Sequence, residues 1–151
     1  MPMTLKDRED LKLDLIIEAL RSRGTVRLKA LGTSMLPSVW PGDQLTIQSA
    51  AHDDVVPGDI VLAVHNDRVF VHRLVEKSAS QNSFWCITKG DAMPQKDPPA
   101  AASELLGRVV SIQRGNRSFS PSRRVSLVHS VLARMFCNSD CVRNLALSFR
   151  P

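Results

Sequence analysis

Ser34 and His72 have the side-chain types that nucleophilic hydrolysis requires. A serine hydroxyl becomes a good nucleophile when a base takes its proton, and a neutral imidazole, with an unperturbed pKa of about 6.5, can do so near neutral pH. Ser34 stands in the stretch ALGTSMLP, residues 30–37, where a predicted strand ends. His72 lies inside another predicted strand, Val69–Val75. Taken singly, Ser34 also fits a structural loop serine and His72 a core or surface histidine, so the residue types leave both roles open.

The aspartates that could assist such chemistry fall into two groups. Asp43, Asp59 and Asp91 each follow a glycine, and an aspartate in that setting commonly bonds the backbone of its own turn. Asp97 lies instead in an irregular segment before Pro98-Pro99, where the following proline restricts its backbone. We expect the first group to stabilise turns, and a solvated loop acid is the simplest interpretation of Asp97.

A helix is predicted ahead of these residues and another after them. Thr4 and Asp7 form a capping box for a helix that runs to about Ser22, and Gly24 ends it. Its apolar residues recur at helical spacing: Leu13, Ile16, Ile17 and Leu20. The helical period returns from Val125, with an apolar face that contains Val128, Val131, Leu132 and Met135.

Short strands fill the middle of the chain. Alternating or apolar runs predict strands at residues 25–31, 44–47, 60–64, 69–75, 84–88 and 105–113. Turn residues predict a hairpin turn at Asp67-Arg68, a polar loop at 78–83 and a long loop at 89–102. Because hairpins join most of these strands, the pattern favours an antiparallel or mixed β-core over a doubly wound sheet.

The predicted fold is therefore mainly β with an N-terminal and a C-terminal helix, α+β overall. With 151 residues, the chain is expected to form one domain around one core. Within it we expect an N-terminal helix at 1–24, a β-core at 25–114, and a basic linker with the C-terminal helix at 115–151.

Composition narrows the classes of function. The net charge is +5, and no basic run is interleaved with aromatic residues, so no nucleic-acid partner is expected. The apolar stretches are far shorter than the roughly 20 residues of a membrane span, and the charged segment Lys6–Asp10 does not resemble a signal peptide. A cytoplasmic location is expected.

Cysteine and arginine usage adds two further expectations. Three cysteines leave at least one thiol unpaired, and Cys137 and Cys141 lack further ligands at zinc-site spacing, so neither a metal site nor a cofactor is predicted. Several arginines accompany the C-terminal helix: Arg123, Arg124, Arg134 and Arg143. A basic amphipathic helix can lie on an anionic membrane surface, and a helix that covers a core has the same pattern.

Five motifs in register suggest how these residues combine. The chain resembles the S26 signal-peptidase family, within the wider S24/S26 group that includes the self-cleaving S24 repressors. The resemblance spans about residues 25–113 and rests on Gly32-Thr33-Ser34-Met35-Leu36-Pro37 with Gly42-Asp43, Gly58-Asp59-Ile60-Val61, Val71-His72-Arg73-Leu74-Val75, Thr88-Lys89-Gly90-Asp91 and Leu106-Gly107-Arg108-Val109.

The resemblance implies a β-barrel-like S24/S26 peptidase core and a role for each site residue. Bacterial members carry a lysine where this chain has His72, so the chain looks like the archaeal and endoplasmic-reticulum type, without its membrane anchor. By that likeness Ser34 is the nucleophile, His72 the base, and Asp97 the acid that orients it, with Asp91 as a supporting acid. Many bacterial members place an oxyanion-binding serine where this chain has Gly32. The likeness therefore implies that backbone N–H groups near Ser34 bind the oxyanion. Thr33, Ser34 and Met35 are the residues expected to contact the oxyanion and the substrate.

The leading hypothesis is a serine endopeptidase, similar to signal peptidases, that cuts a precursor protein or peptide through an acyl-enzyme. One alternative is a catalytically inactive module of the same fold that binds peptides or a partner. Another is a self-cleaving regulator. The short N-terminal helix is too small for a helix-turn-helix domain, and His72 replaces the lysine of the repressors, which argues against that alternative.

Overall fold

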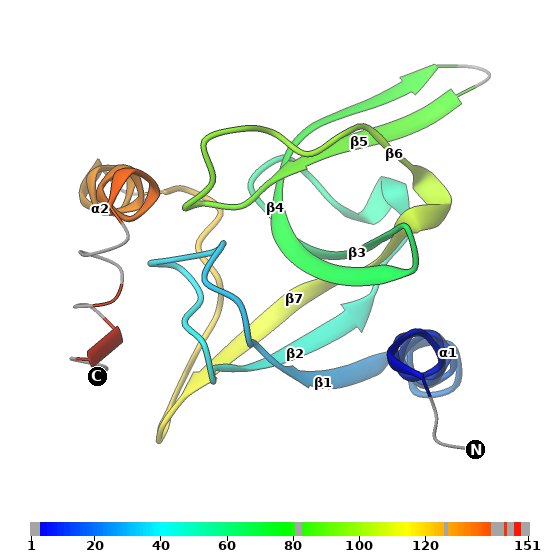
Figure 1. Ribbon diagram of the computed structural model, residues 1–151. Coiled ribbons are helices and arrows are strands. Elements are labelled where there is room, and N and C mark those ends of the chain that lie inside the picture. The colour runs from blue at the N-terminus through cyan, green and yellow to red at the C-terminus, as the bar shows by residue number, and fades with distance from the viewer. Residues whose placement is uncertain (1–3, 81–82, 126, 140–143, 145–146, 149–151) are drawn as a thin grey trace.

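The computed structural model describes residues 4–80, 83–125, 127–139, 144 and 147–148. Two α-helices flank a β-sheet, as the sequence predicts (Figure 1). The helices are α1 (Leu5–Arg23) and α2 (Leu127–Asn138). The strands are β1 (Thr25–Lys29), β2 (Gln44–Ser49), β3 (Ile60–His65), β4 (Arg68–Ser80), β5 (Ser83–Lys89), β6 (Ala100–Ala101), β7 (Leu105–Arg114) and β8 (Arg117–Phe119).

Helix α1 begins and ends where its capping residues predict. The Thr4 hydroxyl accepts the Asp7 N–H at 3.2 Å, and the Asp7 carboxylate accepts the Thr4 N–H at 2.9 Å. Gly24 ends the helix in the left-handed conformation, with φ of 71°, which glycine adopts without a Cβ penalty. The buried side chains of Ile16 and Leu20 then fix the helix against the sheet.

All strand pairs in the sheet are antiparallel, which confirms the predicted fold class. The strand order is β1-β2-β7-β3-β4-β5-β6, and β8 pairs with β7. β4 is long and strongly curved (Figure 1), and its register with β5 shifts between Leu74 and Glu76. Such a bulge bends a strand, so one continuous strand contributes to two parts of a curled sheet.

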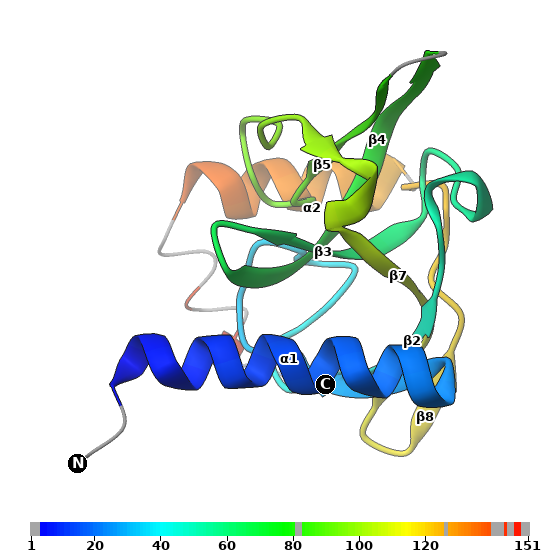
Figure 2. The same ribbon diagram turned by 90° about the vertical axis from the view of Figure 1, so that its right-hand side faces the viewer.

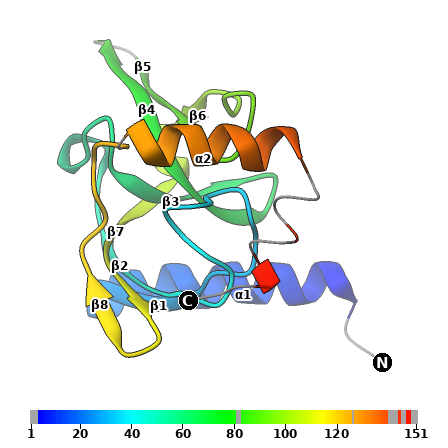
Figure 3. The same cartoon turned by 90° about the vertical axis from the view of Figure 1, so that its left-hand side faces the viewer.

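The two helices cover opposite sides of the molecule, and the segment that carries Ser34 lies between them (Figures 2 and 3). α1 contacts β1, β2, β4 and β7 and shares its core with sheet residues such as Leu45, Ile47 and Ile112. α2 packs through Phe136 against Leu36 and Ala92. Each helix therefore closes a different apolar surface.

Three predicted connections differ in the structure. The β3–β4 turn is at Asn66–Asp67, not Asp67-Arg68, because both residues adopt positive φ (50° and 61°), which Asn and Asp tolerate. The predicted polar loop at 78–83 is largely strand, because Ser78 and Ala79 pair with Trp85 and Phe84 in an extended hairpin. The predicted loop at 89–102 contains β6 at its end.

The other differences lie at the strand and helix ends. β1 ends at Lys29, before Leu31, and β8 is a short exposed strand that the sequence pattern does not predict. α2 begins at Leu127 rather than Val125. Its core side is formed by Leu132, Ala133 and Phe136, whereas Val128, Val131 and Met135 are exposed. Cys141 and Arg143 lie outside the described residues.

Neither α1 nor α2 combines the length and apolarity needed to cross a membrane, within the residues that the structure describes.

Shortening a buried side chain in the core between α1 and the sheet should strongly lower the free energy of unfolding. Ile47 is fully buried in that core, so Ile47→Ala is expected to lower the free energy of unfolding by about 2–5 kcal/mol. Leu15 on α1 is 62% exposed, and Leu15→Ala serves as the control. Urea unfolding measures both variants, and equal losses would contradict this assignment of the core.

Candidate active site

The loop that carries Ser34 joins β1 to β2 over residues 30–43, and we call it the serine loop. A buried carboxylate fixes it at its base. Asp43 is fully buried, accepts the Trp40 N–H at 2.8 Å and pairs with the Arg114 guanidinium at 2.7 Å. Backbone bonds between Ala30 and residues 42 and 43 close the loop. The predicted turn-stabilising role of Asp43 is confirmed, and Asp59 does the same by accepting the Val56 N–H at 3.0 Å.

Ser34, His72 and Asp97 form one hydrogen-bonded chain. Ser34 Oγ lies 3.0 Å from His72 Nε2, and His72 Nδ1 lies 2.6 Å from Asp97 Oδ2. The same Asp97 oxygen accepts the Thr88 hydroxyl at 2.6 Å. The His72 side chain is 13% exposed and that of Asp97 24%, so the chain is sheltered yet reachable from solvent.

Backbone contacts bring the segment between β5 and β6 against the serine loop. The Ala92 N–H donates to the Ser34 carbonyl oxygen at 2.8 Å, and the Asp97 N–H donates to the Thr88 carbonyl oxygen at 2.8 Å. A Cβ on Gly90 would lie 2.7 Å from the Ser34 carbonyl oxygen, closer than atoms can pack. Glycine at position 90 therefore allows the approach that places Asp97 beside His72.

Asp91, expected from the likeness to act as a supporting acid, points to a different partner. Its carboxylate receives Nε and Nη2 of Arg73 at 2.8 and 2.7 Å and also accepts the Ser38 hydroxyl. The Arg73 and Asp91 side chains are only 8% and 5% exposed. The structure thus brings Asp97, and not Asp91, to His72.

The geometry permits proton transfer along the chain from Ser34 to His72. A carboxylate on Nδ1 holds the imidazole with its proton toward Asp97, which leaves Nε2 able to accept the serine proton. The N–H groups of Ser34 and Met35 donate to no acceptor among the described residues, which is compatible with the oxyanion role that the likeness implies for the backbone here. Thr33 is half-buried beside them, and Gly32, with open space around its Cα, adds no donor side chain.

A mainly apolar cleft of about 460 Å³ leads to Ser34. Its lining combines α1 residues Lys12 and Ile16, serine-loop residues Gly32, Ser34 and Met35, and β4 residues Val69, Phe70 and Val71 with others of the core. β1 is the end strand of the sheet, and β5 pairs with β4 only from Arg73 onward. The cleft therefore lies near two strand edges that have no partner strand among the described residues.

The other histidines that the structure describes are engaged elsewhere. His52 is buried, with its ring nitrogens 3.4 Å from Asp53 and 3.3 Å from the Trp85 carbonyl oxygen, and His65 lies 3.5 Å from Glu104. In the described part of the chain, His, Cys, Asp and Glu residues form no group that could hold a metal ion. Sequence reasoning missed Thr88 and Ser38 as partners of the two aspartates, although Thr88 stands in a motif that it singled out.

Comparison with known protein families shows which family this chain belongs to. A family model described as Peptidase S24-like matches residues 2–110. The chain belongs to this family. S24-like membership supports a peptidase-type enzyme at the family level, with a protein or peptide as substrate, and it agrees with the mostly antiparallel sheet and two helices. A comparison with curated proteins finds no match.

Asp91 and Asp97 should contribute unequally to the free energy of unfolding. Asp91→Ala leaves the buried Arg73 guanidinium without its carboxylate, so unfolding free energy should fall by about 3–5 kcal/mol. Asp97→Ala removes hydrogen bonds at a partly exposed position, and about 1 kcal/mol is expected. Thermal and urea unfolding measure both; a larger loss for Asp97→Ala would contradict the structural role of Asp91.

Proposed function

We propose that this protein is a serine endopeptidase, similar to signal peptidases, that hydrolyses a peptide bond in a precursor protein or peptide. The observation that supports it best is the continuous Ser34–His72–Asp97 chain, with heavy-atom distances of 3.0 and 2.6 Å. The proposal assigns the nucleophile to Ser34, the general base to His72 and the orienting carboxylate to Asp97. Asp91 supports them indirectly, through the structure around Arg73.

In the first half of the reaction Ser34 Oγ attacks the scissile carbonyl carbon while its proton passes to His72 Nε2. The imidazolium that forms is stabilised by the Asp97 carboxylate on Nδ1. The negative oxygen of the tetrahedral intermediate accepts hydrogen bonds from the backbone around Thr33, Ser34 and Met35. Collapse breaks the C–N bond, and His72 gives its proton to the leaving amine.

In the second half, water hydrolyses the acyl-enzyme. His72, neutral again, takes a proton from the water as it attacks the ester carbon. The new tetrahedral intermediate uses the same backbone donors. Its collapse releases the carboxylic acid product, and the proton on His72 returns to Ser34 Oγ, so that protons and charges balance over the cycle.

The substrate is proposed to bind in extended form as an added strand. The free edge of β1 and the free edge of the first half of β4, which pairs with β3 on its other side, border the cleft that contains Ser34. A peptide strand placed there would gain main-chain hydrogen bonds, and its alternate side chains would enter the apolar cleft. By likeness to the signal peptidases, small residues precede the bond that is cut.

A fluorophosphonate probe tests the nucleophile directly, because it modifies activated serines. Wild-type protein is expected to take up one probe molecule on Ser34, and Ser34→Ala should abolish the mass increase. Ser49→Ala, at an exposed serine of β2, is the matched control and should label normally. Labelling that survives in Ser34→Ala at the wild-type rate would exclude Ser34 as the nucleophile.

The rate of that labelling tests the orienting role of Asp97. Asp97→Asn keeps the size of the side chain but favours the wrong tautomer of His72, so the rate should fall by roughly 10³–10⁴-fold. Asp67→Asn, at an exposed turn aspartate, should leave the rate unchanged. An Asp97→Asn protein that labels as fast as wild type would remove Asp97 from the site.

A further inference from the structure

A second pocket lies between α2 and the segment that follows β5. We call it the α2 pocket; its volume is about 540 Å³. The residues that line it are Arg73, Val75, Lys89, Gly90, Asp91, Met93, Pro94, Val125, Ser130, Ala133, Arg134 and Cys137. None of the three residues proposed for catalysis is among them. The pocket is therefore separate from the cleft that ends at Ser34.

Positive charge dominates the α2 pocket. Three lining residues are cations, Arg73, Lys89 and Arg134, and Asp91 is the single carboxylate among the described lining residues. Asp91 is already bound by Arg73 and Ser38. Lys89 and Arg134 have no hydrogen-bond or ion-pair partner in the part of the chain that the structure describes. Two positive charges in the pocket are thus uncompensated.

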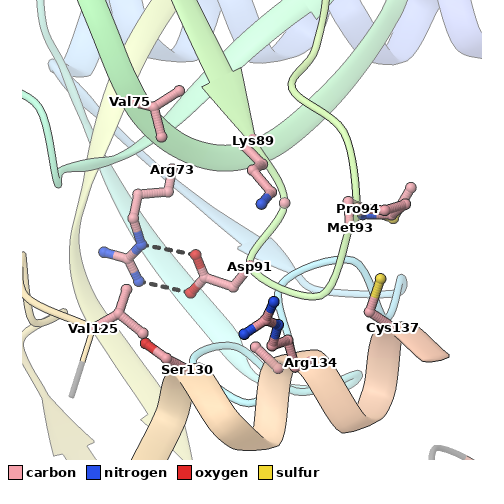
Figure 4. A pocket seen from close by; sticks show the side chains of 12 residues that line it. Arg73, Val75, Lys89, Asp91, Met93, Pro94, Val125, Ser130, Arg134 and Cys137 are labelled. Carbon is pink, nitrogen blue, oxygen red and sulfur yellow. Dashed lines mark hydrogen bonds and ion pairs between the residues drawn. The ribbon is translucent and has the colours of Figure 1, made fainter. Parts of the chain in front are cut away.

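These two cations converge from different elements. Figure 4 shows the Lys89 amine pointing into the pocket from the end of β5 and the Arg134 guanidinium rising toward it from α2, on either side of Asp91. An ammonium group supplies a compact charge, and a guanidinium supplies a planar fork of donors that matches the oxygens of carboxylate and phosphate groups. Their convergence fits an oxyanion better than a neutral or cationic ligand.

The rest of the lining distinguishes the pocket from a plain basic surface. Val75, Val125, Met93, Pro94 and Ala133 add apolar surface to it, although Met93, Pro94 and Arg134 are exposed, so the pocket is open to solvent. Arg73 is held beside Asp91, because its Nη1 also donates to the carbonyl oxygens of Gly58 and Ser122, at 2.7 and 2.9 Å. The Arg73–Asp91 pair is therefore held in place, and the net positive charge of the pocket comes from Lys89 and Arg134.

We propose that the α2 pocket binds an oxyanion, a carboxylate or phosphate group, between Lys89 and Arg134. The group comes either from a free small anion or from an acidic side chain of a peptide. The pocket adjoins the active site through Gly90, which packs on the backbone of Ser34, so an occupant contacts the segment that holds Asp97. The proposal concerns binding alone and does not depend on peptidase activity.

Cys137 provides a local sensor because its thiol lines the pocket (Figure 4). In a Cys141→Ser background, iodoacetamide should modify Cys137, while Cys86 stays unreactive because burial, with a smaller contribution from Glu104, raises the pKa of its thiol. Inorganic phosphate, compared with sodium chloride at equal ionic strength, is expected to slow the alkylation of Cys137 several-fold. Mass spectrometry of the intact protein follows the rate.

Variants assign the effect to the two cations. Arg134→Gln and Lys89→Gln should each abolish protection by phosphate, whereas Arg124→Gln, an exposed arginine that does not line the pocket, should retain it. A second arm replaces phosphate with the amidated, acetylated peptides Ala-Ala-Asp-Ala and Ala-Ala-Asn-Ala. Protection by the first peptide and not by the second, in the absence of a phosphate effect, assigns the site to a peptide carboxylate.

Two results would overturn the proposal. One is alkylation of Cys137 at the same rate with phosphate, with the aspartate peptide and with chloride. The other is protection that is equal in the Arg134→Gln, Lys89→Gln and Arg124→Gln proteins, which would mean a general salt effect. Because neither readout involves catalysis, a wild-type Ser34 that does not react with the fluorophosphonate probe would refute the proposed function and leave this result intact.

Discussion

The buried ion pair between Arg73 and Asp91 is the contact on which the rest of the site depends. One guanidinium joins β4 to the segment after β5, to the serine loop through Ser38, and to the chain before α2 through the Ser122 carbonyl oxygen. A charge of this kind is costly to bury unless every donor is satisfied, and here the polar atoms of buried described side chains all have partners. The pair therefore fixes several segments together in a single arrangement.

Strand geometry connects that ion pair to the proposed catalytic site. Neighbouring residues on a strand point to opposite faces, so Arg73 enters the buried network while His72 faces Ser34. The segment after β5 repeats the division, since Asp91 binds Arg73 and Asp97 binds His72. One segment thus supplies both aspartates, Asp91 for the buried network and Asp97 for the His72 ring. The Ser34 carbonyl oxygen accepts the Ala92 N–H, which ties the proposed nucleophile to the same segment.

The sequence predicted the parts whose signals are local. The Thr4 cap, the Gly24 stop, the strand alternation and the turn roles of Asp43 and Asp59 depend on neighbours within a few residues, and each is confirmed. The family spacing predicted that Ser34, His72 and Asp97 meet. It did not predict that Asp91 binds Arg73, because the path of the segment is set by backbone bonds to Ser34 and Thr88, which do not depend on residue type. β8 and the serine-rich end of β4 were missed because pairing with a neighbour, not apolar alternation, makes them strands.

The tautomer of His72 tests the account most directly. In protein labelled with ¹⁵N-histidine, and with His72 assigned by comparison with His72→Gln, the neutral ring is predicted to carry its proton on Nδ1, facing Asp97, with Nε2 free to accept from Ser34. Asp97→Asn should shift the proton toward Nε2. A wild-type His72 protonated on Nε2, or a tautomer that Asp97→Asn leaves unchanged, would contradict the proposed site.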